Sequence, residues 1–293
     1  MAGPESGTTL MSKRALKNDF FELEYLTHSL RISGITPKGK NNLLVDLSHQ
    51  PPVPTPYGDF YFRGGHRLWH APEAMPRTYI PDENELKITE MPNGVVLETE
   101  TEPGANIRKR IEIKLATDSP SLTLTHTLFN DGLWSLELAP WAITQFRLGG
   151  IVVLPMPTEK VDDAALLPNR QISFWTYARL NDKRLNLRDE FSLFHAESAL
   201  PPFKMGYFNS HGWLAYFIDG VLFKKTFSAM TNATYPDNNC NAELYCNHEF
   251  VELESLGPLT RLEPGASVQH QETWELLEVN TLPQEVQQML LKK

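Results

Sequence analysis

The chain has 293 residues with a hydrophobic fraction of 41% and an aromatic fraction of 10%, enough apolar material for one large β domain or two ordinary domains. Its formal net charge of -9 and pI of about 5.5 argue against nucleic acid or an anionic membrane as the main partner. No apolar run approaches the ~20 residues of a membrane-spanning helix, and the polar N-terminus lacks the apolar segment of a secretory signal. We therefore expect a soluble, cytoplasmic protein with no nucleic-acid or membrane partner; the sequence leaves its oligomeric state open.

Residues 1–15 carry no periodic pattern, and we expect them to be a disordered segment ahead of a single β domain at residues 16–293. Alternating strand patterns with Gly, Pro, Asn or Asp at the turns then follow one another along the chain. The clearest pair of predicted strands forms a hairpin that turns at Asp219-Gly220. Residues 282–293 predict a short C-terminal helix. The predicted strands cover residues 86–90, 94–102, 107–116, 121–132, 134–147, 172–180 and 203–230.

A succession of this many strands predicts an all-β fold. One long meander has to curl, split or pack into two sheets. We expect a large antiparallel two-sheet supersandwich with a cleft on its concave face. The alternative is two smaller β domains, stacked, with a break near residues 155–158.

The segment from residue 246 to residue 276 predicts two strands joined by a Gly/Pro turn, and it carries two carboxylates among apolar residues. Because side chains alternate along a strand, Glu252 and Glu254 share one face, about 6.6 Å apart. Carboxylates on such a strand are unfavourable in a plain core and useful in a binding cleft. The alternative is a strand with one solvent-exposed face, which is common in antiparallel sheets.

Residues 62–73 form a second notable motif. Gly64-Gly65 permits a bulge or a close backbone approach to a ligand. Arg67 and Trp69 follow on one face of an extended segment, and an indole with a guanidinium suits a sugar, since Trp stacks on C–H faces and Arg binds hydroxyls or acids. The alternative is a core Trp and an Arg paired with a surface carboxylate.

Metal and cofactor motifs are weak. His66 and His70 are four residues apart, but the glycines and Pro72 disfavour the helix that such a metal pair needs. Cys240 and Cys246 match neither a CxxC motif nor a zinc site. The chain contains no HExxH motif, P-loop or dinucleotide fingerprint. We expect no metal and no cofactor.

Four segments together resemble the galactose mutarotase-like superfamily, which includes the aldose 1-epimerases. They are GGHRLWHAPE, APWAITQ, KMGYFNSHGWLAY and ELESLGPLTRLEPGASVQHQETWEL, and the resemblance spans roughly residues 20–278. It implies a β-supersandwich that binds a carbohydrate in its concave cleft. It also implies a general base at Glu254 and a sugar-binding arginine at Arg67.

The chain departs from that family where the chemistry needs an acid. Trp141 stands at the position assigned to one family histidine, and a second histidine has no clear counterpart. An indole N–H cannot protonate a ring oxygen at neutral pH. The acid would then come from elsewhere, with His66, Lys204 and Tyr177 as candidates. The expected substrate-binding residues are Arg67, Trp69, Trp141, Lys204, Glu252 and His66.

The leading hypothesis is carbohydrate binding in the cleft, extending to aldose 1-epimerase-like interconversion of anomers with Glu254 as base. The alternative is a non-catalytic sugar-binding or regulatory module that uses the same cleft without turnover. A lyase or hydrolase with this fold would need its own acid/base pair. The sequence does not choose among hexoses, sugar phosphates and oligosaccharides.

Overall fold

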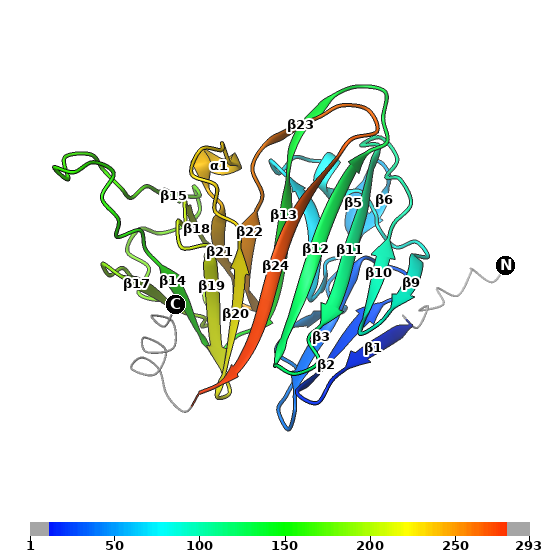
Figure 1. The fold of residues 1–293 in the computed structure, drawn as a ribbon, viewed down its shortest axis with the longest axis horizontal. Coiled ribbons are helices and arrows are strands. Elements are labelled where there is room, and N and C mark those ends of the chain that lie inside the picture. Colours follow the sequence, from blue (N-terminus) through cyan, green and yellow to red (C-terminus); the bar gives the residue numbers. More distant parts are fainter. Residues whose placement is uncertain (1–11, 280–293) are drawn as a thin grey trace.

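Two ten-stranded antiparallel sheets make up most of the computed structural model, which describes residues 12–279 (Figure 1). The expected all-β two-sheet sandwich is confirmed, and the helix expected at residues 282–293 lies outside the described residues. In spatial order the first sheet contains β1 (Lys13–Lys17), β2 (Phe21–Leu26), β3 (Arg31–Pro37), β8 (His66–Ala71), β13 (Leu136–Arg147), β22 (Phe250–Leu256), β21 (Ala242–Cys246), β18 (Phe203–Tyr207) and β15 (Ile172–Phe174), with β23 (Thr260–Leu262) beside β13.

The second sheet takes its strands from both halves of the chain, as the first sheet does. Both sheets therefore contain strands from before and after residues 155–158, the segment considered as a domain break. In spatial order its strands are β16 (Leu185–Asn186), β17 (Phe191–His195), β14 (Ile151–Pro155), β19 (Trp213–Ile218), β20 (Val221–Phe227), β24 (Ser267–Glu278), β12 (Ser121–Asn130), β11 (Ile107–Leu115), β10 (Gly94–Glu98) and β9 (Lys87–Met91).

Short elements complete the described chain. Strand β1 includes residues 13–15, so the expected domain boundary at residue 16 falls inside a strand. Within residues 12–279, no helix has the length and apolar character that crossing a bilayer would require. The remaining elements are β4 (Asp46–Leu47) paired with β7 (Arg63–Gly64), β5 (Val53–Thr55) paired with β6 (Gly58–Phe60), the 3-10 helix η1 (Arg77–Tyr79) and the short helix α1 (Pro236–Asn239).

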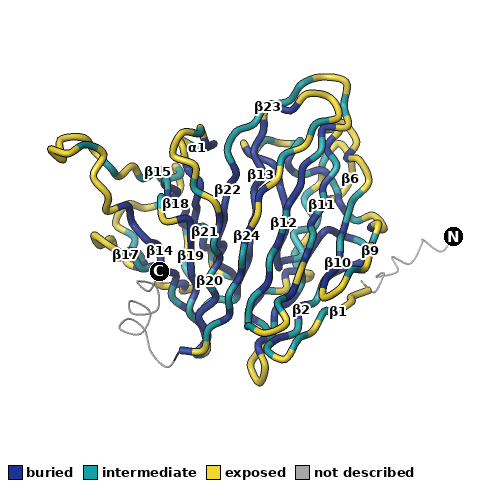
Figure 2. The backbone as a smooth tube through the Cα atoms, viewed as in Figure 1, coloured by how far each residue is buried: buried dark blue, intermediate teal, exposed yellow. Residues whose placement is uncertain are grey.

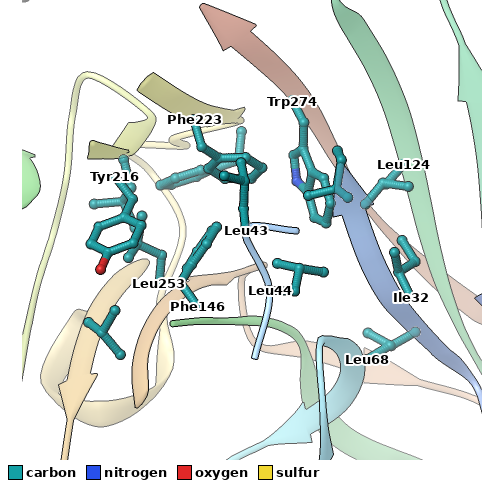
Figure 3. Close-up of a cluster of buried hydrophobic side chains, with 14 of the residues drawn as sticks. Ile32, Leu43, Leu44, Leu68, Leu124, Phe146, Tyr216, Phe223, Leu253 and Trp274 are labelled. Carbon is teal, nitrogen blue, oxygen red and sulfur yellow. The ribbon is translucent and has the colours of Figure 1, made fainter. Parts of the chain in front are cut away.

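The main hydrophobic core lies between the sheets. Phe146 and Leu253 of the first sheet face Phe223 and Trp274 of the second, and all four are buried (Figure 3). Burial follows the strands, whereas exposed residues concentrate in the connecting loops (Figure 2). Because side chains alternate along each strand, the inward half of every central strand contributes to this core.

Glycines take up positive φ angles at the two places that the sequence singled out. Asp219 and Gly220 have φ of 53° and 74° and join β19 to β20, which confirms the predicted hairpin. At Gly64 and Gly65, also at positive φ, an added Cβ would lie 2.1 Å from a backbone carbonyl oxygen. The close approach at these two glycines is therefore to the chain's own backbone.

Strands β22 and β24 correspond to the two strands predicted within residues 246–276, but they do not form a hairpin. Strand β22 lies in the first sheet and β24 in the second, so the intervening turn crosses between sheets. Every residue of β22 is buried, so the alternative of one solvent-exposed face is wrong for this strand. The carboxylates of Glu252 and Glu254 are thus held away from bulk water.

Candidate functional site

The candidate site lies on the face of the first sheet that is turned away from the second sheet. Strand register sets its composition, because residues opposite one another in neighbouring strands point to the same face. Ile143 of β13 lies opposite Arg67 of β8 on one side and Glu254 of β22 on the other. Glu243 of β21 lies opposite Glu254 in turn. Residues far apart in the sequence therefore form one polar and aromatic surface.

A cavity of about 410 Å³ opens on this face. Eight of its sixteen lining residues are aromatic, and charged or amide side chains stand between the rings. The aromatic members are Phe62, Trp69, Tyr79, Trp141, Trp175, Tyr177, Tyr245 and Phe250, and the others are Gln50, Arg67, Glu73, Ile143, Pro202, Lys204, Asn247 and Glu252. Five of the predicted site residues, Arg67, Trp69, Trp141, Lys204 and Glu252, are thus brought together.

Arg67 and Glu252 form an ion pair at one wall of this cavity. The Arg67 Nη2 lies 3.4 Å from Glu252 Oε1, and the guanidinium stacks 4.1 Å from the centre of the Trp69 ring. Gln145 donates a hydrogen bond of 2.8 Å to the same Glu252 oxygen. One carboxylate oxygen of Glu252 is therefore held by two donors, while the side chain retains 10% exposure at the cavity.

Lys204 forms the centre of a second charged group. Its Nζ lies 2.8 Å from Glu243 and 3.1 Å from Glu254, and it sits over the indoles of Trp141 and Trp175 at 4.8 and 4.6 Å. Trp141 also donates a hydrogen bond of 2.7 Å to Glu254. The Glu254 side chain is fully buried, so Trp141 and Lys204 separate the expected base from the cavity.

Burial and like charges perturb the ionisation of these groups. Burial, and then the neighbouring Glu254 carboxylate, raise the pKa of Glu252 to about 7 against the opposing effects of Arg67 and Lys204. Burial also raises the pKa of Glu243 well above its ordinary value. Burial acts to lower the pKa of Lys204, but the carboxylates of Glu243 and Glu254 outweigh it and raise that pKa well above 10.5.

The three candidates for a general acid differ in position and in acidity. Tyr177 and Lys204 line the cavity, but burial raises the pKa of the Tyr177 phenol and the adjacent carboxylates raise that of Lys204, so neither readily releases a proton near neutral pH. His66 does not reach the cavity. Alternation along β8 turns it to the opposite face from Arg67 and Trp69, into the space between the sheets.

His66 belongs instead to a buried polar network between the sheets. Its Nε2 lies 2.8 Å from His126 Nε2, and its Nδ1 lies 2.9 Å from the Thr144 hydroxyl. Burial, and then the neighbouring His126, hold the pKa of His66 well below 6.5. Lys225 donates to Thr144 and lies 2.7 Å from the Glu272 carboxylate.

The same network contains the one group of residues, within the described part of the chain, whose side chains lie close enough to share a metal ion: His66, His126 and Glu272. Two imidazoles and a carboxylate are ordinary metal ligands. Here, however, the Lys225 ammonium already supplies the positive charge beside Glu272, and the imidazoles hydrogen-bond to one another. A metal ion would have to displace that ion pair and that hydrogen bond.

Several cavity residues were missed by sequence reasoning. Trp175 and Tyr245 are examples: Trp175 follows the edge strand β15, and Tyr245 lies on the interior strand β21, and neither was among the predicted site residues. Tyr245 alternates with Glu243 on one strand, and Trp175 alternates with Tyr177 just beyond β15, a pattern that could have indicated a shared face. An adjoining cavity of about 360 Å³ shares five of its eight lining residues with the first and adds Asp237.

The fold is that of the galactose mutarotase-like β-sandwiches, as comparison with solved structures shows. A galactose mutarotase-like protein from Lactobacillus casei superposes with a TM-score of 0.62 at 12% identity, over 91% of this chain and 100% of the other. A protein provisionally described as an aldose 1-epimerase from Escherichia coli K12 gives 0.60 at 14% identity, over 92% and 100%. A galactose mutarotase related enzyme from Lactobacillus acidophilus gives 0.58 at 8% identity, over 92% and 100%. No family model and no curated protein matches the chain.

Proposed function

We propose that this protein binds a neutral carbohydrate in the cavity on the first sheet. The observation that carries the proposal is the lining, in which half of the residues are aromatic and charged or amide groups stand between them. Aromatic faces pack against the C–H faces of a sugar ring, and the polar groups between them hydrogen-bond its hydroxyls. A volume of about 410 Å³ falls within the usual range for small-molecule sites.

The charges favour a neutral ligand over a phosphorylated one. Arg67 and Lys204 are the cations at the cavity, and both are already paired with carboxylates. Glu73 and Glu252 also line the cavity, and Asp237 lines the adjoining one. A phosphate would have to displace Glu252 from Arg67, or Glu243 and Glu254 from Lys204, to pair with either cation.

Interconversion of sugar anomers is the second candidate function. Glu243, Glu252 and Glu254 lie close together, with Glu252 at the cavity and the other two behind Lys204, and burial raises the pKa of Glu243 and Glu252. Clusters of perturbed carboxyl groups are a common feature of sites that transfer protons. The resemblance assigned the general base to Glu254, and the structural neighbours include proteins named for mutarotase chemistry. A sugar-binding module without turnover is the outcome if ligands bind but anomers do not exchange.

The test of carbohydrate binding is thermal melting against neutral sugars and sugar phosphates. A neutral sugar at a hundredfold excess over its dissociation constant is expected to stabilise the folded state by about 2.7 kcal/mol. Trp175→Ala removes a cavity wall and is expected to abolish that shift. Trp134→Ala, at a position 80% exposed, is the matched control and should keep it.

Two results would contradict the proposal. One is the absence of any shift with neutral mono- and oligosaccharides in the wild-type protein. The other is an equal loss of the shift in both tryptophan variants, which would place the ligand outside this cavity. Stabilisation by sugar phosphates alone would reject the charge argument.

A further inference from the structure

We propose that Glu252 is the catalytic acid and base of the site, and that Glu254 is a positioning residue behind it. The inference rests on the second proposed function, anomer interconversion. It differs from the assignment implied by the family resemblance, which places the proton-transferring carboxylate at Glu254. The two glutamates share one face of β22, so their position on the strand does not decide which of them transfers protons. Their surroundings do.

Accessibility separates the two carboxylates. Glu252 lines the cavity and keeps 10% of its side chain exposed there, whereas the Glu254 side chain is fully buried. Trp141 and Lys204 occupy one oxygen of Glu254. A group that transfers protons must come within hydrogen-bond reach of the reacting atoms. Among these two, Glu252 meets that requirement.

Within the part of the chain that the structure describes, only one carboxyl oxygen of Glu252 is free to transfer a proton, because the other accepts hydrogen bonds. Arg67 and Gln145 both approach Oε1, and Oε2 is without a hydrogen bond among the described residues. The two donors fix the carboxyl group through Oε1, which leaves Oε2 available to a ligand in the cavity that Glu252 lines. In addition, burial and the nearby Glu254 charge keep a proton on Glu252 up to near-neutral pH.

One carboxyl group is sufficient for the reaction. Glu252 donates its proton to the ring oxygen as the bond from that oxygen to the anomeric carbon breaks. The bonding pair stays on the ring oxygen, and a lone pair of the anomeric hydroxyl forms the carbonyl double bond. The Glu252 carboxylate then takes the hydroxyl proton, which leaves the open-chain aldehyde and restores the acid. Rotation and reclosure by the reverse steps give the other anomer.

The neighbouring Lys204 and Glu254 set the protonation of Glu252. The like charge of Glu254 raises the pKa of Glu252, and Lys204 forms an ion pair of 3.1 Å with Glu254. Further titratable groups surround the pair from every neighbouring element: Arg67 on β8, Glu243 and Tyr245 on β21, Tyr79 of η1, Glu73, Tyr177, Asp237 of α1 and Lys225 on β20. Removal of the Glu254 charge should therefore shift the pH profile of the reaction while Glu252 stays in place.

The experiment measures anomer exchange of the sugar that melting identifies as a ligand. NMR follows the exchange across pH 5 to 9 in wild type and four variants. Wild type is expected to lose activity as pH rises through about 7, when Glu252 loses its proton. Glu252→Gln should lose ~100-fold or more. Glu252→Asp should regain part of that activity, and Glu254→Gln should stay active with its alkaline limb moved to lower pH. Glu112→Gln, the same substitution on β11 of the second sheet, should match wild type.

Sugar-induced melting shifts in each variant separate loss of chemistry from loss of binding or folding. Three results would overturn the inference and leave carbohydrate binding intact. They are turnover retained in Glu252→Gln, turnover lost in Glu254→Gln, and an active Glu254→Gln whose alkaline limb has not moved. Wild-type protein that binds sugar without exchanging anomers also overturns it. Infrared difference spectra against Glu252→Gln give a check that needs no sugar: absence of a carboxylic acid band at pH 6 would reject a protonated Glu252.

Discussion

At the scale of single residues, Glu252 and Glu254 show how strongly surroundings decide the behaviour of identical side chains. They are two positions apart on one strand face, yet Glu254 is enclosed by Trp141 and Lys204 while Glu252 borders a cavity. Alternation predicted that they share a face, and the regular register of β22 with β13 and β21 confirms it. Which of them meets a ligand depends on side chains contributed by other strands.

The raised pKa of Glu252 has a consequence for stability. Between pH 4.5 and about 7 the native state keeps a proton that the unfolded chain releases, so stability falls as pH rises through this interval. Glu252→Gln cannot ionise and avoids this loss. We therefore compare the free energy of unfolding of Glu252→Gln with that of wild type. The difference should shift in favour of the variant by on the order of 2 to 3 kcal/mol from pH 5 to pH 8. Urea unfolding at both pH values measures the gain, and an unchanged difference would refute it.

At the scale of elements, strand β20 places two adjacent lysines in opposite environments. Lys225 points between the sheets, where its Nζ lies 2.7 Å from the buried Glu272 carboxylate. Lys224 points outward and pairs with Glu275 at 3.4 Å, with both side chains partly exposed. Because adjacent residues of a strand point to opposite faces, Lys225 forms a buried ion pair and its neighbour Lys224 forms a surface pair.

This pair of neighbours supplies a matched comparison. Lys225→Met leaves the Glu272 charge buried without its cation and should cost about 3–5 kcal/mol of unfolding free energy. Lys224→Met removes a surface pair and should cost no more than about 1 kcal/mol. Chemical denaturation of both variants measures the costs. Similar losses in the two would show that the inter-sheet network is not held by Lys225.

At the scale of the whole molecule, one hydrophobic cluster joins strands from both sheets. Phe146 packs against Tyr216 and Phe223 of the second sheet, with ring centres 5.0 and 4.8 Å apart (Figure 3). The two sheets therefore stabilise each other across the core, and the cavity lies on the far side of the first sheet from it. Cavity-lining residues and core residues alternate on the same strands.

Loss of a contact between the sheets should lower the free energy of unfolding of the whole domain, with both sheets still unfolding together. Phe146→Ala is expected to cost about 3–5 kcal/mol and to keep a single unfolding transition. Leu133→Ala, at a loop position 85% exposed, should change stability by less than about 0.5 kcal/mol. Circular dichroism and tryptophan fluorescence, followed together, measure both. Two separate transitions in Phe146→Ala would show that the sheets unfold independently.

The sequence by itself determined the strand content, the Asp219-Gly220 hairpin and the sharing of faces along each strand, because these follow from local alternation and turn chemistry. It also singled out Arg67, Trp69 and Glu252, which the structure brings to one cavity. The tertiary structure alone decided that β22 and β24 lie in different sheets. It likewise decided that His66 turns away from the cavity and that Lys204 covers Glu254. These outcomes depend on contacts between distant segments, which no local pattern records.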